Sequence, residues 1–247
     1  TRQFWETGGD AAWKPFAKGG EDAWLLPRVK RSVLWADSRQ EVERYTSSYP
    51  RNEAEYFTEA LSYTVVKESG RRFGYMHSSS IFGHKGSVFI PEADIWKTLS
   101  YVNSHLLTYL MLAQTTERMW EVGQVSKVPW REELGSVDDL ERLSKRAVGH
   151  LVSKRQYDFV SPHYSGPLLL AILGEKDVFD LHEHPPRELR EELTLDSPSS
   201  TTDKESTLSE LGAAAAIHLE RIEADLQSCA EKIDQAVFDV FAISKDQ

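Results

Sequence analysis

Lysines and glycines in residues 13–20 (WKPFAKGG) are the first candidates for chemistry in this sequence. Lys14 and Lys18 are four residues apart, and the pair Gly19-Gly20 follows directly. Glycines let backbone N–H groups approach a phosphate closely, and lysines supply the opposite charge. The segment therefore predicts a small cationic loop that contacts phosphate. The alternative is an ordinary exposed turn with two solvated lysines.

Two further pairs of residues have side chains that suit DNA. Arg51 and Asn52 follow a proline, and Arg and Asn are the side chains best suited to bidentate contacts with guanine and adenine. Alternatively, Asn52 caps local backbone and Arg51 pairs with a nearby acid. Arg71 and Arg72 are expected in a turn between strands, where such a pair faces phosphate or solvent.

A polar stretch and several aromatic residues complete the candidates. His77, Ser78, Ser79 and Ser80 form a patch that could enter a groove, although a satisfied turn is equally consistent with them. Lys85 is either a phosphate contact or merely exposed. Five aromatic side chains could stack on extruded bases, but core packing is favoured because small sheets need large side chains. These are Trp5, Trp13, Phe16, Trp24 and Trp35.

No motif assigns a catalytic, cofactor or metal residue. G-x-G-x-x-G, Walker and G-x-S-x-G patterns are all absent. His182 and His184 suggest metal ligands, and a free-standing enzyme using them is one rival function, but a solvated loop entering a helix is favoured. The single cysteine, Cys229, excludes an internal disulfide and a Cys-based zinc site, and it predicts a small core residue in a cytoplasmic protein.

Charge is divided unevenly along the chain. The 247 residues carry a formal net charge of -10. Residues 1–130 hold 16 Lys and Arg against 15 Asp and Glu, a net charge of +1, whereas residues 131–247 hold 13 against 24, a net charge of -11. The first half can therefore present a basic face to nucleic acid, and the acidic half is expected to face away from it.

Hydrophobic patterns predict an α+β fold, with a small twisted mixed or antiparallel sheet, flanking helices and an α-helical C-terminal region. Strands are expected over 29–35, 59–66, 72–77 and 88–90, helices over 38–49, 91–103 and 104–114 (the last one buried), and an extended segment over 119–128. No apolar run is long enough for a transmembrane helix, and no signal peptide is visible. Because the chain starts at Thr1 without Met, a fragment of a longer protein is expected.

The second half is expected to be mostly helical. A charged amphipathic helix over 137–154 is followed by a proline-bearing section, a Ser/Thr-rich mobile linker and a long helix that Thr207 caps. The apolar positions of the long helix form a narrow seam, which suits either a partner helix or packing on its own domain. The expected division is 1–130 for target recognition, 131–193 as a spacer, 194–206 as a linker and 207–247 as the long helix.

The order of segments over residues 1–130 resembles the target recognition region of large adenine-specific DNA methyltransferases. These are the type IIG restriction-modification enzymes and the related methyltransferases of phage-defence systems such as BREX and DISARM. The matching segments are WKPFAKGG, VLWADS, RNEAEYF, EALSYTVV, the helix DIWKTLSYVNSHLLTYLM and VGQVSKVP. The C-terminal EKIDQAVFDVFAIS is similar to a helix of type I and type IIG enzymes. Ala60 and Ala242 stand where relatives carry glycine.

The resemblance implies a module that reads double-stranded DNA but does not methylate it unaided. The Asn/Asp-Pro-Pro-Tyr motif that holds the flipped adenine is absent, as is the glycine-bearing loop for S-adenosylmethionine. Both are expected in a methyltransferase domain upstream, and other defence-system subunits are further expected partners. The remaining alternative is a helical protein-interaction module that makes no contact with DNA.

Overall fold

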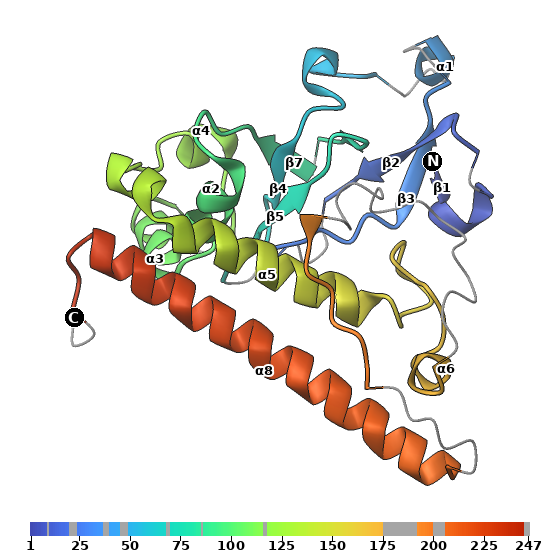
Figure 1. The fold of residues 1–247 in the computed structure, drawn as a ribbon. Helices are drawn as coiled ribbons and strands as arrows, with labels where there is room; N and C mark the ends of the chain where they lie inside the picture. The colour runs from blue at the N-terminus through green and yellow to red at the C-terminus, as the bar shows by residue number, and fades with distance from the viewer. Residues whose placement is uncertain are drawn as a thin grey trace.

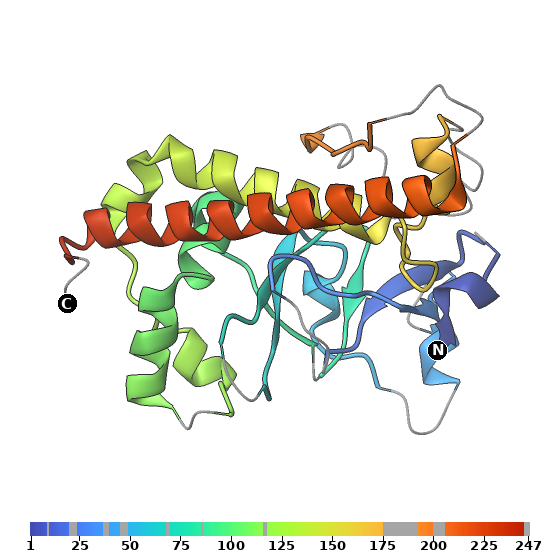
Figure 2. The same ribbon diagram turned by 90° about the horizontal axis from the view of Figure 1, so that it is seen from below.

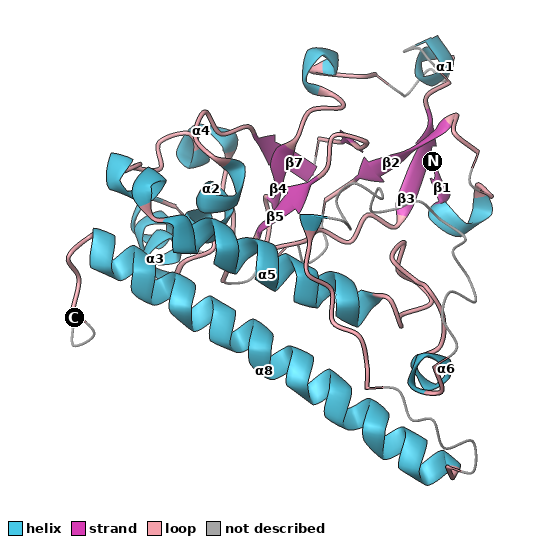
Figure 3. Cartoon of the chain, in the orientation of Figure 1, coloured by secondary structure: helices cyan, strands magenta, loops and turns pink. Residues whose placement is uncertain are grey.

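Two small sheets and a set of helices make up the computed structural model of the chain, which confirms the predicted α+β class (Figures 1 and 3). The structure describes residues 1–8, 10–19, 24–36, 40–44, 49–67, 70–84, 86–115, 118–174, 192–199 and 206–244. No helix in these ranges is both long and apolar enough to cross a membrane.

The first sheet has the strand order β1-β3-β2-β6. Its strands are β1 (Arg2–Gln3), β3 (Arg31–Leu34), β2 (Trp13–Ala17) and β6 (Ile81–Phe82). Residues 13–17 are thus a strand, and the expected cationic loop is shorter, beginning at Lys18. β2 pairs antiparallel with β3, with Lys14 opposite Val33 and Phe16 opposite Arg31. Because opposite residues share a face, these four side chains lie on one side of the sheet.

The second sheet confirms three of the predicted strands. β4 (Ala60–Thr64) is central, with β5 (Phe73–Met76) and β7 (Gly86–Phe89) antiparallel on either side. All five residues of β4 are buried, so it is a central core strand. Helix α2 (Ile95–Val102) packs on this sheet, and its Trp96 ring stacks on Tyr75 at a centroid distance of 4.4 Å.

Helix capping explains two helix starts, while two other predictions differ from the structure. Asp94 caps α2 and Ser104 caps α3 (His105–Gln114) through side-chain bonds to backbone N–H groups. The α3 helix is not wholly buried, because Tyr109 is 71% exposed. Residues 119–128, expected to be extended, contain the short helix α4 (Val122–Val125). The remaining short helices are α1 (Gln40–Glu43) and the 3-10 turns Phe4–Glu6, Glu53–Glu55 and Glu132–Ser136.

The predicted helices of the second half are confirmed as α5 (Asp138–Arg155) and α8 (Leu208–Val240), with α6 (Leu168–Ile172) between them. Thr207 and Glu210 form a capping box at the start of α8. The α8 helix runs antiparallel along α5, on the side away from the sheets (Figures 1 and 2). Its apolar seam therefore packs within this chain, which is the second of the two expectations for it.

One hydrophobic core crosses residue 130. It joins Leu61 of β4 and Leu107 of α3 to Leu140 of α5 and Leu226 of α8. The start of the predicted linker also packs, since Leu195 lies against the core and the Asp196 backbone N–H donates to Ser153 Oγ at 2.7 Å. Positions 200–205 of that linker lie outside the described residues.

Candidate nucleic-acid interface

A pocket of about 200 Å³ between the two sheets carries four cationic residues, and we call it the basic pocket. They are Lys18, Arg28, Lys30 and Arg31. Gly19 lines it on one side, and Ser62 and Thr64 of β4 line it on the other. None of the described residues lining the basic pocket is acidic. Clustered cations beside hydroxyl and backbone donors suit a phosphate oxygen.

The segment that carries Arg28 and Lys30 is held by the acidic half of the molecule. Arg155, the last residue of α5, donates to the carbonyl oxygens of Leu26 at 2.8 Å and Pro27 at 3.2 Å. Leu25, with a φ of 61°, exchanges backbone hydrogen bonds with β5. Both contacts fix the backbone just before Arg28.

Glycines set the position of the Lys18 turn. Gly19 has a φ of 75°, which a residue with a side chain rarely adopts. Gly86 of β7 lies close to the backbone of residues 17–19. A Cβ at Gly86 would collide with the Ala17 carbonyl oxygen and lie 2.9 Å from the Gly19 nitrogen. The predicted phosphate contact Lys18-Gly19 is therefore held against the second sheet. Its neighbours in the prediction, Gly20 and Lys85, lie outside the described residues.

A larger cavity of about 1110 Å³ adjoins the basic pocket, and Phe16 lines both. Its wall includes an edge-to-face aromatic group in which Tyr56 meets Trp35 at 5.3 Å and Phe82 at 5.1 Å between centroids. Burial raises the pKa of Tyr56, so its phenol stays protonated and neutral at physiological pH.

Arg51 and Asn52 line this larger cavity and are exposed. Asn52 has a φ of 56° and begins a 3-10 turn, but its side chain makes no capping hydrogen bond. The Arg51 guanidinium lies 6.0 Å from the centroid of the Tyr49 ring. The structure therefore leaves both side chains accessible for the predicted contacts with bases.

Arg71 and Arg72 have structural surroundings instead of the solvent or phosphate expected for them. Arg71 donates to Asp234 of α8 at 2.6 Å and lies over the Trp24 ring. Arg72 is fully buried, with its guanidinium 3.7 Å from the centroid of the Trp120 ring, and burial lowers the pKa of Arg72 to about 10. In this conformation the Arg72 guanidinium cannot reach DNA, and the Arg71 guanidinium is held by α8.

The serine stretch fits the alternative of a satisfied turn. Ser80 is 1% exposed, and its backbone bonds to His77 and Phe57. The Ser79 backbone N–H donates to His77 Nδ1 at 3.1 Å. His77, Ser78 and Ser79 keep partial exposure, whereas Ser80 is buried and unavailable to a groove.

Other predicted residues are placed as follows. Trp35 is buried, as expected of a core residue, whereas Trp5 is 49% exposed. Trp13, Phe16 and Trp24 are partly buried. Cys229 is buried, which raises the pKa of its thiol, as expected for a small core residue. The candidate metal ligands His182 and His184 lie outside the described residues.

Sequence reasoning missed Arg28, Lys30 and Arg31 as candidate contacts. The signal was present, because three cations occupy four positions and residues 24–36 contain no acid. The mixture of β-branched and basic residues over 29–35 predicts a strand, but it does not indicate where the cationic side chains gather. The fold then joins these cations to Lys18 from the neighbouring strand end.

Comparison with known proteins gives one distant similarity. No family model matches the chain. Over 144 residues, 57% of its length, the chain is 26% identical to the adenine-specific methyltransferase BrxX of Escherichia coli O9:H4 (strain HS). The matched part is 12% of that protein, so the chain spans only a small part of its length. This similarity supports a link to a methyltransferase-related family.

Proposed function

We propose that this chain binds double-stranded DNA as the target recognition part of an adenine-specific DNA methyltransferase in a BREX-type or related phage-defence system. The observation that carries the proposal is the basic pocket, which four cations and no described acidic residue line in a chain of net charge -10. The similarity to BrxX supplies the methyltransferase context.

The cations of the basic pocket and the residues at the larger cavity make different contacts with DNA. Lys18, Arg28, Lys30 and Arg31 contact phosphates and set the register of the DNA, and the Gly19 amide adds a backbone contact. Lys14 lies on the same sheet face as Arg31 and extends this positive surface. Arg51 and Asn52, at the adjoining cavity, read base edges.

Chemistry belongs to another part of the protein. A methyltransferase domain outside this chain binds S-adenosylmethionine and extracts the target adenine, while the module described here selects the site. The protein acts in the cytoplasm with the DNA it methylates, and other defence-system subunits are candidate partners. A helical interaction module without DNA contact is less well supported, because the seam of α8 already packs on α5.

Salt-dependent binding tests the phosphate contacts. A labelled duplex should bind the 247-residue chain, and the logarithm of its affinity should fall linearly with that of the salt concentration. The double variant Arg28→Ala/Lys30→Ala should bind at least about tenfold more weakly for every sequence, with a slope shallower by roughly 0.9 per lost contact. Lys232→Ala changes an exposed lysine of α8, so it is the control and should leave binding unchanged. Absence of binding even at low salt contradicts the proposal.

A second measurement separates base reading from phosphate contact. Arg51→Ala or Asn52→Ala in the full-length protein should relax the sequence methylated in cells, as mapped by sequencing modified adenines. A good bidentate contact discriminates by about 1–3 kcal/mol, so a clear change at one position of the site is expected. If both variants methylate the original sequence alone, these residues do not read bases.

A further inference from the structure

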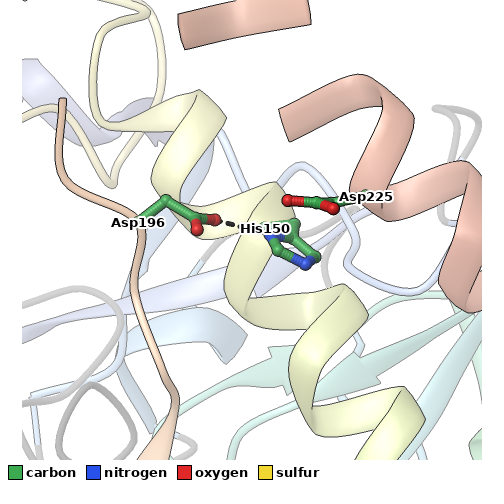
Figure 4. A group of neighbouring side chains, drawn as sticks. All are labelled: His150, Asp196 and Asp225. Atoms are coloured by element: carbon green, nitrogen blue, oxygen red, sulfur yellow. Dashed lines mark hydrogen bonds and ion pairs between the residues drawn. The ribbon is translucent and has the colours of Figure 1, made fainter. Parts of the chain in front are cut away.

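Three side chains from separate segments meet on the helical side of the molecule, distant in sequence from the basic pocket. His150 comes from α5, Asp196 from the segment 194–199 and Asp225 from α8 (Figure 4). One ligand atom from each lies within 4.8 Å of the other two. His150 is 3% exposed, so its imidazole is held inside the fold.

Contacts with the rest of the fold position these three residues, in addition to any contact that they make with one another. Asp196 is held by its backbone bond to Ser153 Oγ, one turn along α5 from His150. Gly149 allows this approach, because a Cβ there would collide with the Thr194 carbonyl oxygen. Asp225 is fixed because Ile222 and Leu226 beside it on α8 are buried.

The charges in this group are unbalanced. Two carboxylates face one imidazole. In the neutral tautomer with its proton on Nδ1, the His150 ring donates to Asp196 Oδ2, and the two atoms are 2.5 Å apart. The other ring nitrogen, Nε2, accepts from Arg146 at 3.3 Å, a long bond from an exposed side chain. Two carboxylates and a neutral imidazole match the charge of a divalent cation.

We propose that His150, Asp196 and Asp225 form a binding site for a divalent transition-metal ion of the zinc type. Imidazole nitrogen and carboxylate oxygen are both zinc ligands, and water would fill the remaining positions. Metal–ligand bonds of about 2.0–2.2 Å place neighbouring ligand atoms roughly 3 Å apart. The His150 and Asp196 atoms therefore need to separate by less than about 1 Å.

Such an ion would fasten α8 and the 194–199 segment to α5. Arg155, which holds the basic segment, is five residues beyond His150 on the same helix. The metal site itself does not depend on DNA binding, so either proposal can fail without the other.

Arg146 sets the affinity of the site. A metal ion on Nδ1 moves the ring proton to Nε2, which then becomes a donor facing the Arg146 donor. The Arg146 side chain must swing away, which its exposure permits. Arg146 therefore competes with the ion, and its removal should strengthen binding.

Calorimetric titration with zinc chloride tests the site in the untagged, chelator-treated chain. One ion per chain is expected. Asp225→Asn should weaken binding at least tenfold, whereas Asp239→Asn, an exposed carboxylate on the same helix, should not change it. His218→Ala removes a buried imidazole that lies on α8 and is not a proposed ligand, so this variant should bind zinc as wild type does.

Four results would overturn the assignment or a part of it. A wild-type chain that binds no zinc, or an Asp225→Asn chain that binds it equally well, ends the proposal. Magnesium binding as tightly as zinc would exclude the transition-metal class. Arg146→Ala should bind at least threefold more tightly, and a variant that does not would show that the ion is not on Nδ1. As a folding check, zinc should raise the melting temperature of wild type but not of Asp225→Asn.

Discussion

The sheet region and the helical region use charge in different ways. In residues 1–130, cations converge on a pocket between two sheets, and exposed Arg51 and Asn52 line the cavity beside it. In the described part of residues 131–244, many acids lie on exposed helix faces, and ion pairs form within or between helices, such as Arg142 with Asp139 and Lys154 with Glu223. The sheet region gathers cations at a pocket, whereas most of the described acids of the helical region lie at exposed positions.

The two regions differ in the distribution of charge on their surfaces, but they share a hydrophobic core. The same hydrophobic core contains residues of both regions. Polar contacts cross between them as well, since Arg71 pairs with Asp234 and Arg155 holds the backbone before Arg28. The boundary in charge near residue 130 is therefore not a boundary in packing, and the acidic helices support the basic surface.

The largest expected effect tests whether the regions share one core. Asp234 accepts from Arg71 at 2.6 Å and from the His105 backbone N–H at 2.7 Å. Asp234→Ala leaves Arg71 partly buried without its carboxylate, so the free energy of unfolding should fall by about 3 kcal/mol. Asp239→Ala, exposed on the same helix, is the control. Urea denaturation followed by tryptophan fluorescence should show a single transition; two transitions would mean that the regions unfold separately.

Two glycines offer a matched pair, one from each region. Gly86→Ala and Gly149→Ala each place a Cβ against a backbone carbonyl, and each should cost about 1–3 kcal/mol of stability. Only Gly86→Ala moves the Lys18-Gly19 turn, so only that variant should lose DNA affinity when both are compared well below their melting temperatures. Equal loss in both would show that binding depends on overall stability and not on this turn.

A smaller effect tests support of one region by the other. Arg155→Ala removes two hydrogen bonds to the Leu26 and Pro27 carbonyls, which should weaken DNA binding by about fivefold, near 1 kcal/mol. The salt slope should stay unchanged if Arg155 positions the segment without touching phosphate. A shallower slope in this variant would make Arg155 a direct contact.

The smallest effect lies at the start of α8. The Thr207 backbone N–H and hydroxyl donate to Glu210, which lowers the pKa of that carboxyl. A depressed pKa means that the stabilisation is present above the ordinary glutamate pKa and is lost as pH falls through the folded value. Amide hydrogen exchange in the first turn should therefore be faster in Glu210→Ala than in wild type at neutral pH. The difference should vanish in acid, and Glu220→Ala should show none.

Local sequence patterns predicted the secondary-structure elements better than they predicted the tertiary contacts of individual side chains. The hydrophobic pattern predicted β4, and apolar residues spaced by three or four with Thr207 as the cap predicted α8, because these signals reside in neighbouring residues. The helical period of residues 122–125 was missed because four residues carry too little pattern. The sequence predicted the same turn environment for Arg71 and Arg72. In the structure, Arg71 pairs with Asp234 of α8, whereas Arg72 lies over the Trp120 ring.

By itself, the sequence determined the α+β class, the long capped helix and the uneven charge, since composition and short-range periodicity fix them. Only the tertiary structure decided that Arg28, Lys30 and Arg31 join Lys18, and that His150 meets Asp196 and Asp225. Both groups form because buried side chains far apart in the chain pack together, in a small cluster beside the basic pocket and in the larger core beside His150. Contacts at such separation depend on that packing, and no local pattern encodes them.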